Sequence, residues 1–416
     1  MTITFVISFA LLVLISLVGY RVSQLPKNVW LLFIAQPLGV SSASMVVLAG
    51  GLLGGKIASS TEYATIPVAL MISMTAAGVF PAAFIMKKFG RRIGTIMGLS
   101  CAVVGALISS YAAAKSSFLT LLVGTAFLGF SMAFVAQMRF AVIESLKNPK
   151  DNPKAISILM IGSMFAAVLG PEMAVMAKDW IISEHGYAGS FVGLAVMLLV
   201  SIALITCLDP IGVKVQKNDQ VPRPLTEIIK QPIFIIAVTA GTVAYGVMSY
   251  VMTASPLSMH HLHGHDLEST KWVIQSHIIA MYLPSLFSAL LIKIFGLRKL
   301  MAIGTSIYLA MIIVALMGHE FMHYWMAMVL LGVGWNFLFT SGTLLLPESY
   351  RSSERFKVQA TNDFTIFFIQ ALGSLSAGWV LFNHGWEWMI QIIVPLLLFM
   401  FIILYWFFRV RSISDA

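Results

Sequence analysis

Apolar runs of about 18–25 residues recur along the whole chain, and they constrain its fold more than any other feature. A run of this length crosses a bilayer as an α-helix, because a helix satisfies its backbone hydrogen bonds internally. The chain is therefore predicted to be an all-α integral membrane protein. The expected spans are residues 3–20, 28–51, 63–86, 94–113, 118–142, 155–177, 188–208, 231–256, 271–293, 299–317, 322–346, 358–382 and 387–409.

The charged residues support this interpretation by their scarcity and their placement. Only 10% of the residues are charged, against about 25% in soluble proteins. Of the 26 lysines and arginines, 22 fall in alternate loops that we assign to the cytoplasm and 4 in the other loops. This asymmetry is the positive-inside signal of membrane proteins, and it accounts for the net charge of +9 without a nucleic-acid partner. The sequence has no P-loop, so ATP-driven transport is not expected.

An internal repeat divides the chain. The stretch FIMKKFGRRIGTIMG (84–98) aligns without gaps on LLIKIFGLRKLMAIG (290–304). Each stretch falls in the second inner loop of a six-helix set, and a long polar loop separates the sets. We therefore expect an extra N-terminal transmembrane segment and linker (1–27), a six-helix bundle (28–208), a cytoplasmic linker (209–230) and a second six-helix bundle with a short tail (231–416). Two parallel repeats of this kind are typical of secondary transporters.

The loop AAFIMKKFGRR resembles the loop signature of the major facilitator superfamily, G-x-x-x-D-R-x-G-R-R, with Ala83 and Lys87 in place of the glycine and the aspartate. PESYRSSERFK (347–357) resembles the corresponding loop of the second half. The resemblance implies the two-bundle fold of that superfamily and transport by alternating access. It also implies an inner gate formed by ion pairs; the alternative is a pair of solvated basic loops. The candidate gate residues are Arg91, Arg92, Glu348, Arg351 and Arg355.

One acidic residue lies in the outer half of a predicted membrane helix. Glu172 follows the pair Gly170-Pro171 in VLGPEMAVM, and this pair resembles the Gly-Pro of the antiporter signature. An ionisable side chain at membrane depth is costly and is usually functional or paired. Glu172 is thus expected to balance the charge of a cation or to carry a proton, unless it reaches the outer interface.

The sharpest candidate site lies on the seventh and eighth helices of the twelve-helix set. Met248 and Met252 are four residues apart and share one helix face, as do His277 and Met281. At 1.5 Å per residue, all four lie roughly 6–15 Å from the outer ends of their helices. Thioether sulfur with imidazole is a ligand set that suits Cu(I). The alternative is ordinary packing, since methionine commonly fills gaps in cores.

Histidines also crowd the outer loop between these two helices, in SMHHLHGHDLES. A His-rich tract is typical of metal binding, so the loop is a candidate metal-collecting segment; otherwise it is a solvated loop or a pH-sensitive lid. Its histidines are His260, His261, His263 and His265. A later stretch, HEFMH (319–323), matches the zinc-protease motif, but it lies at a short turn entering a membrane helix. We do not expect an enzyme.

The paired motifs Met-x-x-x-Met and His-x-x-x-Met are similar to those of CcoA-like copper importers, bacterial major facilitator proteins, and the likeness covers most of residues 28–409. The resemblance implies an inner-membrane importer that supplies copper for heme–copper oxidase assembly, with copper chaperones or assembly factors as partners. Copper would be the substrate, and no resident cofactor is expected. The same group is similar to riboflavin importers, so the alternative is uptake of riboflavin or another small organic solute, with efflux of an organic solute as a third option. The cavity residues would then be Tyr245, Tyr282, Trp335 and Asn336.

Overall fold

The protein folds entirely into helices in the part of the chain described by its computed structural model, residues 2–59, 63, 66–211 and 221–414. Residues 212–220 of the expected linker lie outside the described part. Ten helices are long and apolar enough to cross a membrane within the described residues, and a shorter apolar helix covers Trp272–Phe287. The all-α membrane fold is thus confirmed. The chain forms two compact units, Met1–Lys214 and Val215–Ala416.

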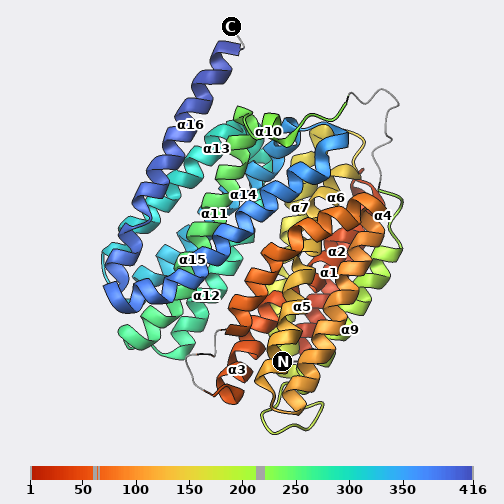
Figure 1. Cartoon of the computed structure of the whole chain (residues 1–416), viewed down its shortest axis with the longest axis vertical. Helices are drawn as coiled ribbons and strands as arrows, with labels where there is room; N and C mark the ends of the chain where they lie inside the picture. The colour runs from red at the N-terminus through yellow and green to blue at the C-terminus, as the bar shows by residue number, and fades with distance from the viewer. Residues whose placement is uncertain (1, 60–62, 64–65, 212–220, 415–416) are drawn as a thin grey trace. The chain divides into compact units, whose positions relative to one another are not determined.

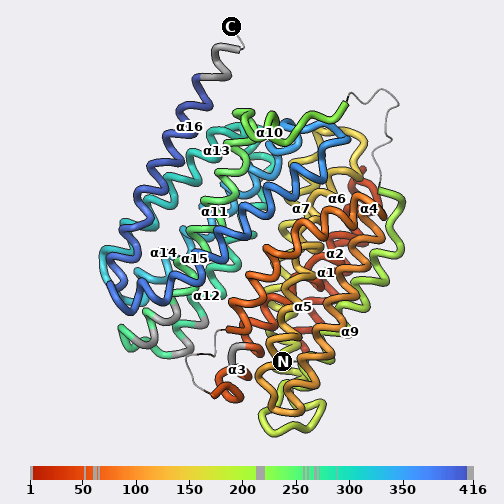
Figure 2. The backbone as a smooth tube through the Cα atoms, in the orientation of Figure 1, coloured from red at the N-terminus to blue at the C-terminus, as the bar shows by residue number. Residues whose placement is uncertain are grey.

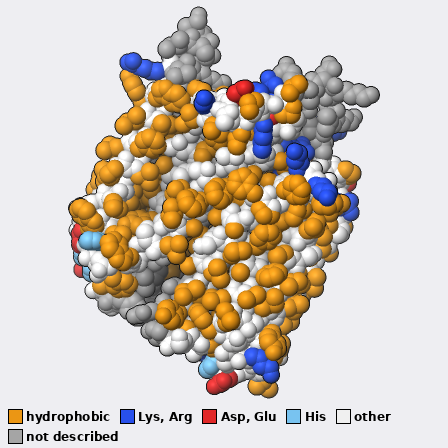
Figure 3. All heavy atoms as spheres, in the orientation of Figure 1, with side chains coloured by type: hydrophobic (Ala, Val, Ile, Leu, Met, Phe, Trp, Pro, Cys, Tyr) orange, Lys and Arg blue, Asp and Glu red, His pale blue; other side chains and the backbone are white. Residues whose placement is uncertain are grey.

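In the N-terminal unit, α2 packs on α7, α8 and α9, while α4 packs on α5 and α9 (Figure 1). Hydrophobic side chains are spread over much of the visible surface, as expected for helices that face lipid (Figure 3). The elements are α1 Thr2–Val22, α2 Lys27–Met45, η1 Val46–Gly50, α3 Gly51–Ile57, α4 Ile66–Ala114, α5 Phe118–Ala136, α6 Met138–Glu144, η3 Pro149–Asp151, α7 Asn152–Met164, α8 Ala166–Met176 and α9 Ala188–Thr206.

In the C-terminal unit, α11 runs beside α14 and α15 (Figure 2), and α14 also packs on α12 and α13. The elements are α10 Leu225–Ile228, α11 Pro232–Leu257, η4 Ser258–Leu262, α12 Leu267–Tyr282, α13 Ser285–Leu316, α14 Phe321–Leu345, η5 Leu346–Ser349, η6 Ser352–Glu354, α15 Arg355–Gln391 and α16 Val394–Ser414. α11 and α12 contact each other only over a short stretch, so α14 is the helix that joins them.

The sequence repeat has a counterpart in the backbone. Gly90 breaks α4 with φ 82° and ψ 166°, and its repeat partner Gly296 breaks α13 with φ 74° and ψ 162°. A Cβ at either position would meet nothing within 4 Å, so the glycine is needed for its backbone conformation and not for space. Each break lies inside a helical stretch long enough to enter the bilayer again on the other side of the glycine. The two repeats therefore turn at the same position by the same means.

Candidate functional site

Five aromatic side chains meet in the middle of the C-terminal unit. The ring of Tyr245 on α11 lies edge-on to three others: 5.3 Å between centroids to Trp335, 5.1 Å to Phe339 and 5.8 Å to Phe367. Tyr282 on α12 lies edge-on to Trp335 at 5.7 Å, and Trp335 stacks on Phe339 at 4.9 Å. These centroid distances and orientations are those that aromatic rings prefer. We call these five residues the aromatic cluster.

The aromatic cluster has a buried base and an accessible side. Trp335 is 1% exposed and Phe339 3%, whereas Tyr245 and Tyr282 are partly exposed. Trp335 and Phe339 are four residues apart on α14, so they stand on one face of this central helix. A flat aromatic ligand that approached the two tyrosines would find the indole beneath them.

Buried polar atoms without hydrogen-bond partners lie along the same part of α14. They are Trp335 Nε1, Asn336 Oδ1, Thr340 Oγ1 and Ser341 Oγ. The Asn336 amide nitrogen is used, since it donates to the Met281 carbonyl at 2.7 Å and to Ser285 Oγ at 2.8 Å. Most buried polar groups in proteins are paired, so a group of unpaired ones indicates that another molecule supplies the partner. This segment offers one fixed donor, one fixed acceptor and two hydroxyls.

His277 lies in the same unit, on the face of α12 that packs against α14. Its side chain is 0% exposed, and its Nδ1 lies 2.8 Å from the carbonyl oxygen of Met328. Because a carbonyl oxygen only accepts, Nδ1 carries the proton and Nε2 presents a lone pair. Nε2 has no hydrogen-bond partner. Gly332 permits this approach of the two helices, since a Cβ there would lie 2.7 Å from the His277 carbonyl oxygen.

The structure places the four predicted copper ligands on two helices that share few contacts. Met248 is 6% exposed and Met281 7%, and Met252 is half-buried. α14 packs on both α11 and α12 and is the main contact of each of these two helices within this group of three. Among the described residues no group of three or more histidines, cysteines or acidic residues is placed to hold a metal ion. The copper site stays a prediction.

The outer histidines are held by groups from neighbouring helices. The His263 ring stacks on that of His319, with centroids 3.9 Å apart, and His319 Nε2 lies 2.8 Å from Glu387 Oε1. His265 Nε2 lies 2.7 Å from the His319 carbonyl oxygen. The lone pair of an imidazole nitrogen lies in the plane of its ring. Two stacked imidazoles therefore do not direct their lone pairs toward one common ion. The side chains of His260 and His261 lie outside the described residues.

The stretch that matches the zinc-protease motif, residues 319–323, lies at the start of α14. His319 precedes α14, which begins at Phe321, so His319 and His323 are not on one face of a helix. The His319 side chain pairs with Glu387 instead. The motif therefore lacks the helix that its chemistry requires.

The predicted gate residues take part in separate contacts within each unit. Arg91 is 1% exposed and forms a two-pronged pair with Glu144, with N–O distances of 3.0 and 2.7 Å. Its remaining nitrogen donates to Gln137 at 2.6 Å. Arg92 is exposed. The gate itself stays a prediction.

In the C-terminal unit one gate candidate, Arg351, contacts a different acid, Glu354. This side chain is 0% exposed and accepts from the Arg223 guanidinium at 2.6 and 3.0 Å. It also accepts from the backbone N–H of Arg223 at 2.7 Å and of Arg351 at 2.9 Å. The carboxylate raises the pKa of Arg223. We call Arg223 and Glu354 the linker clasp, because their ion pair fastens the end of the linker to the segment just before α15.

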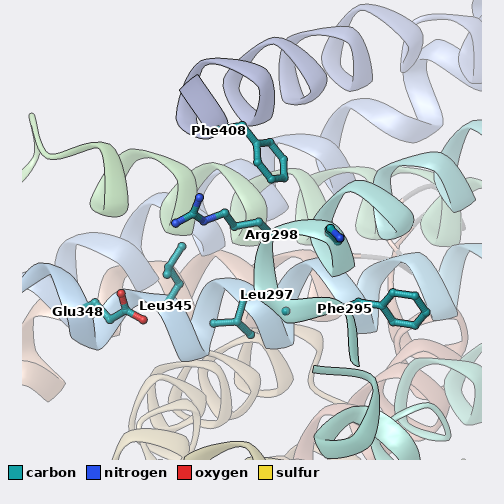
Figure 4. A pocket seen from close by; sticks show the side chains of 8 residues that line it. Phe295, Leu297, Arg298, Leu345, Glu348 and Phe408 are labelled. Atoms are coloured by element: carbon teal, nitrogen blue, oxygen red, sulfur yellow. The ribbon is translucent and has the colours of Figure 1, made fainter. Parts of the chain in front are cut away.

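The other two gate candidates lie near the linker clasp. Arg355 lies over the ring of Phe356 at 4.7 Å. Glu348 lines a pocket of about 290 Å³ together with Arg298 and Phe408 (Figure 4). This pocket belongs to the C-terminal unit and combines an acid, basic side chains and aromatic rings.

Several residues have contacts or burial in the structure that were not predicted from the sequence. Phe339 and Phe367 complete the aromatic cluster, and Arg223 and Glu354 form the linker clasp. Asp363 is 0% exposed inside α15, and its carboxylate accepts from the Asn362 amide at 2.8 Å. An acid eight residues into an apolar helix was the available signal for Asp363. Glu172 on α8, which the sequence did single out, has a buried Oε2 without a hydrogen-bond partner.

Known proteins resemble this chain over nearly its whole length. A riboflavin transporter, RfnT of Brucella anthropi, is 38% identical over 380 residues, which is 89% of this chain and 94% of that protein. Two solved structures share the fold: a bacterial homologue of the iron transporter ferroportin, with TM-score 0.71, and the human organic anion transporter MFSD10, with TM-score 0.72. Each is 12% identical, and they cover 92% and 91% of this chain and 99% and 100% of their own.

A family model matches the same span. The model described as Major Facilitator Superfamily matches residues 29–270 and 240–415. The match agrees with the paired glycine breaks of α4 and α13 and with the two-unit organisation. The family and the relatives are transporters, so the match indicates a transporter and not a zinc protease. The chain belongs to the Major Facilitator Superfamily and is a multi-pass membrane transporter.

Proposed function

We propose that this protein imports riboflavin, or a flavin closely related to it, across the bacterial inner membrane by alternating access. The observation that carries the proposal is the aromatic cluster with its neighbouring unpaired polar atoms on α14. The likeness to RfnT supports the same substrate class, since RfnT is a riboflavin transporter and is 38% identical to this chain. Copper was the first expectation from the sequence; the relative favours the riboflavin alternative.

The chemistry of the flavin ring suits these side chains. The ring is flat and aromatic, and one edge carries an N–H donor between two carbonyl acceptors. Trp335 Nε1 can donate to a carbonyl, and Asn336 Oδ1 can accept from the N–H. An unmade buried hydrogen bond costs about 1–3 kcal/mol, so a ligand that supplies the partner gains that energy on binding. The ring itself would pack against the accessible tyrosines.

Riboflavin uptake in a riboflavin-requiring bacterial strain tests the proposal. Trp335→Phe keeps an aromatic ring and removes the N–H, so we expect uptake to fall about tenfold or more, the equivalent of 1.4 kcal/mol. Trp379→Phe is the matched control, because Trp379 is 63% exposed on α15 and lies outside the aromatic cluster. Wild-type protein that adds no riboflavin uptake over an empty vector, at confirmed expression, would refute the proposal.

Copper import is the second candidate, and one observation favours it. The Nδ1–H of His277 is fixed on a backbone carbonyl, which leaves Nε2 bare, and metal-binding histidines commonly have this arrangement. Met281 is four residues further along the same helix. In this function Met248, Met252, His277 and Met281 would pass Cu(I) inward for oxidase assembly, with Glu172 offsetting its charge.

Parallel transport assays separate the two candidates. His277→Ala and Met248→Leu should abolish radioactive copper uptake if copper is the substrate, and both should leave riboflavin uptake unchanged if the aromatic cluster alone binds the substrate. Accumulation of neither compound, together with resistance to a toxic organic compound, would instead identify an exporter. Each result selects one function.

A further inference from the structure

A groove runs along the cytoplasmic half of α1, the helix that the family model does not include. Its volume is about 520 Å³, far above the roughly 30 Å³ of one water molecule. One wall is the apolar face of α1 and the other comes from α2 and α7. The lining side chains used below are Leu14, Val18, Ser23, Trp30, Lys154 and Ile158.

The groove is shaped by a close contact between α1 and Trp30. A Cβ at Gly19 would lie 2.1 Å from the Trp30 ring, so the indole lies directly against the backbone of α1. The indole N–H donates to Ser23 Oγ at 3.0 Å, and Ser16 Oγ donates to the Trp30 carbonyl at 3.0 Å. These contacts fasten the cytoplasmic end of α1 to α2, and α1 also packs on α8. Val18 remains 51% exposed, so the rest of the groove opens toward the bilayer.

The end of the groove is polar and lies at the cytoplasmic ends of the helices by the positive-inside assignment. Lys154 is exposed, and within the part of the chain that the structure describes it forms no ion pair with an acidic side chain. Ser23 Oγ accepts from Trp30 and, at 3.3 Å, from the backbone N–H of Leu25. Both bonds use the oxygen as acceptor, so the hydroxyl proton remains free to donate outward. An ammonium and a hydroxyl donor at the membrane surface suit a phosphate group.

We propose that this groove binds one anionic phospholipid of the inner leaflet. An acyl chain lies along the apolar stretch between Leu14 and Ile158, and the phosphate meets Lys154 and Ser23. The apolar walls supply the hydrophobic contact. Lys154 favours a negatively charged headgroup, because a juxtamembrane lysine raises the affinity for anionic lipid about fivefold. The lipid thereby fills the space that α1 leaves against the bundle. This site is independent of the transported substrate.

Native mass spectrometry of the purified full-length protein tests the site, with phosphatidylglycerol and phosphatidylcholine of identical acyl chains offered together. Wild type should retain phosphatidylglycerol about fivefold more than phosphatidylcholine. Lys154→Gln should remove this preference and keep the weaker binding of both lipids. Lys150→Gln is the matched control, since Lys150 is exposed on η3 and does not line the groove. Val18→Trp should fill the groove and reduce retention of both lipids.

Three outcomes would overturn the proposal. Equal retention of both lipids by wild type would show that the groove does not select charge. Displacement of phosphatidylglycerol by millimolar inorganic phosphate would identify a plain anion site in which the acyl chain has no part. A loss of preference in Lys150→Gln equal to that in Lys154→Gln would likewise assign the effect to general surface charge.

Discussion

The linker clasp allows a quantitative prediction, because the structure defines each hydrogen bond that the Glu354 carboxylate accepts. Glu354→Ala removes the acceptor of two backbone N–H groups, those of Arg223 and Arg351. Both amides are part-buried, and losing a hydrogen bond from each to the carboxylate costs at least about 1 kcal/mol. The loss of the Arg223 guanidinium contacts should add little free energy, because this side chain is 26% exposed and water can hydrate it. The segment should therefore open more easily by at least about 2 kcal/mol, roughly 30-fold in the opening equilibrium.

Amide hydrogen exchange measured by mass spectrometry at pH 7 reports this opening directly. Peptides that cover residues 221–231 and 349–354 should exchange roughly 30-fold faster in Glu354→Ala, while peptides of α14 stay unchanged. Glu227→Ala is the matched control, because Glu227 is an exposed acid in the same segment. Equal exchange in wild type and Glu354→Ala would refute the argument that the carboxylate holds the linker end.

Three further substitutions test the packing and the buried charges. Gly90→Ala forces an L-residue into a backbone conformation that essentially only glycine adopts and should cost about 1–3 kcal/mol, seen as a lower melting temperature in detergent, whereas Gly378→Ala, where a Cβ meets nothing within 4 Å, should not. Gly332→Val should push α12 from α14 and abolish transport with the protein still inserted, and Gly378→Val should transport normally; equal activity of the two would contradict the close contact. Arg91→Ala breaks the buried two-pronged ion pair with Glu144 and should destabilise the protein by about 3–5 kcal/mol, against little effect for the exposed Arg92→Ala in the same thermal assay.

The membrane fold could be predicted from the sequence because the length of an apolar run directly determines whether it spans a bilayer. The repeat was visible too, and Gly90 and Gly296 share a backbone conformation as well as a sequence position. Helical periodicity also placed His277 and Met281 on one face of α12. It did not say which helix that face meets, and the structure shows that it is α14.

The candidate site was harder to predict, for two physical reasons. The sequence pattern around a phenylalanine in an apolar helix does not distinguish a side chain that faces lipid from one that faces a neighbouring helix or a ligand. Phe339 and Phe367 could therefore not be predicted as members of a site. The linker clasp joins residues 131 positions apart, and nothing local marks such a pair. The riboflavin alternative predicts Tyr245, Tyr282 and Trp335 as cavity residues, and the structure adds that their rings meet.

The central position of α14 has a consequence for how the sequence can vary. Every residue from Gly334 to Leu345 is buried, and Gly332 and Gly342 lie against the backbones of α12 and α11 respectively. The outward face of α1, in contrast, includes Ile3 at 72% exposure. In a library that substitutes every position, α14 should tolerate the fewest replacements and α1 should accept almost any apolar residue. Directed evolution of this transporter toward a new substrate would thus be most productive at Tyr245 and Tyr282, which border α14 without being enclosed.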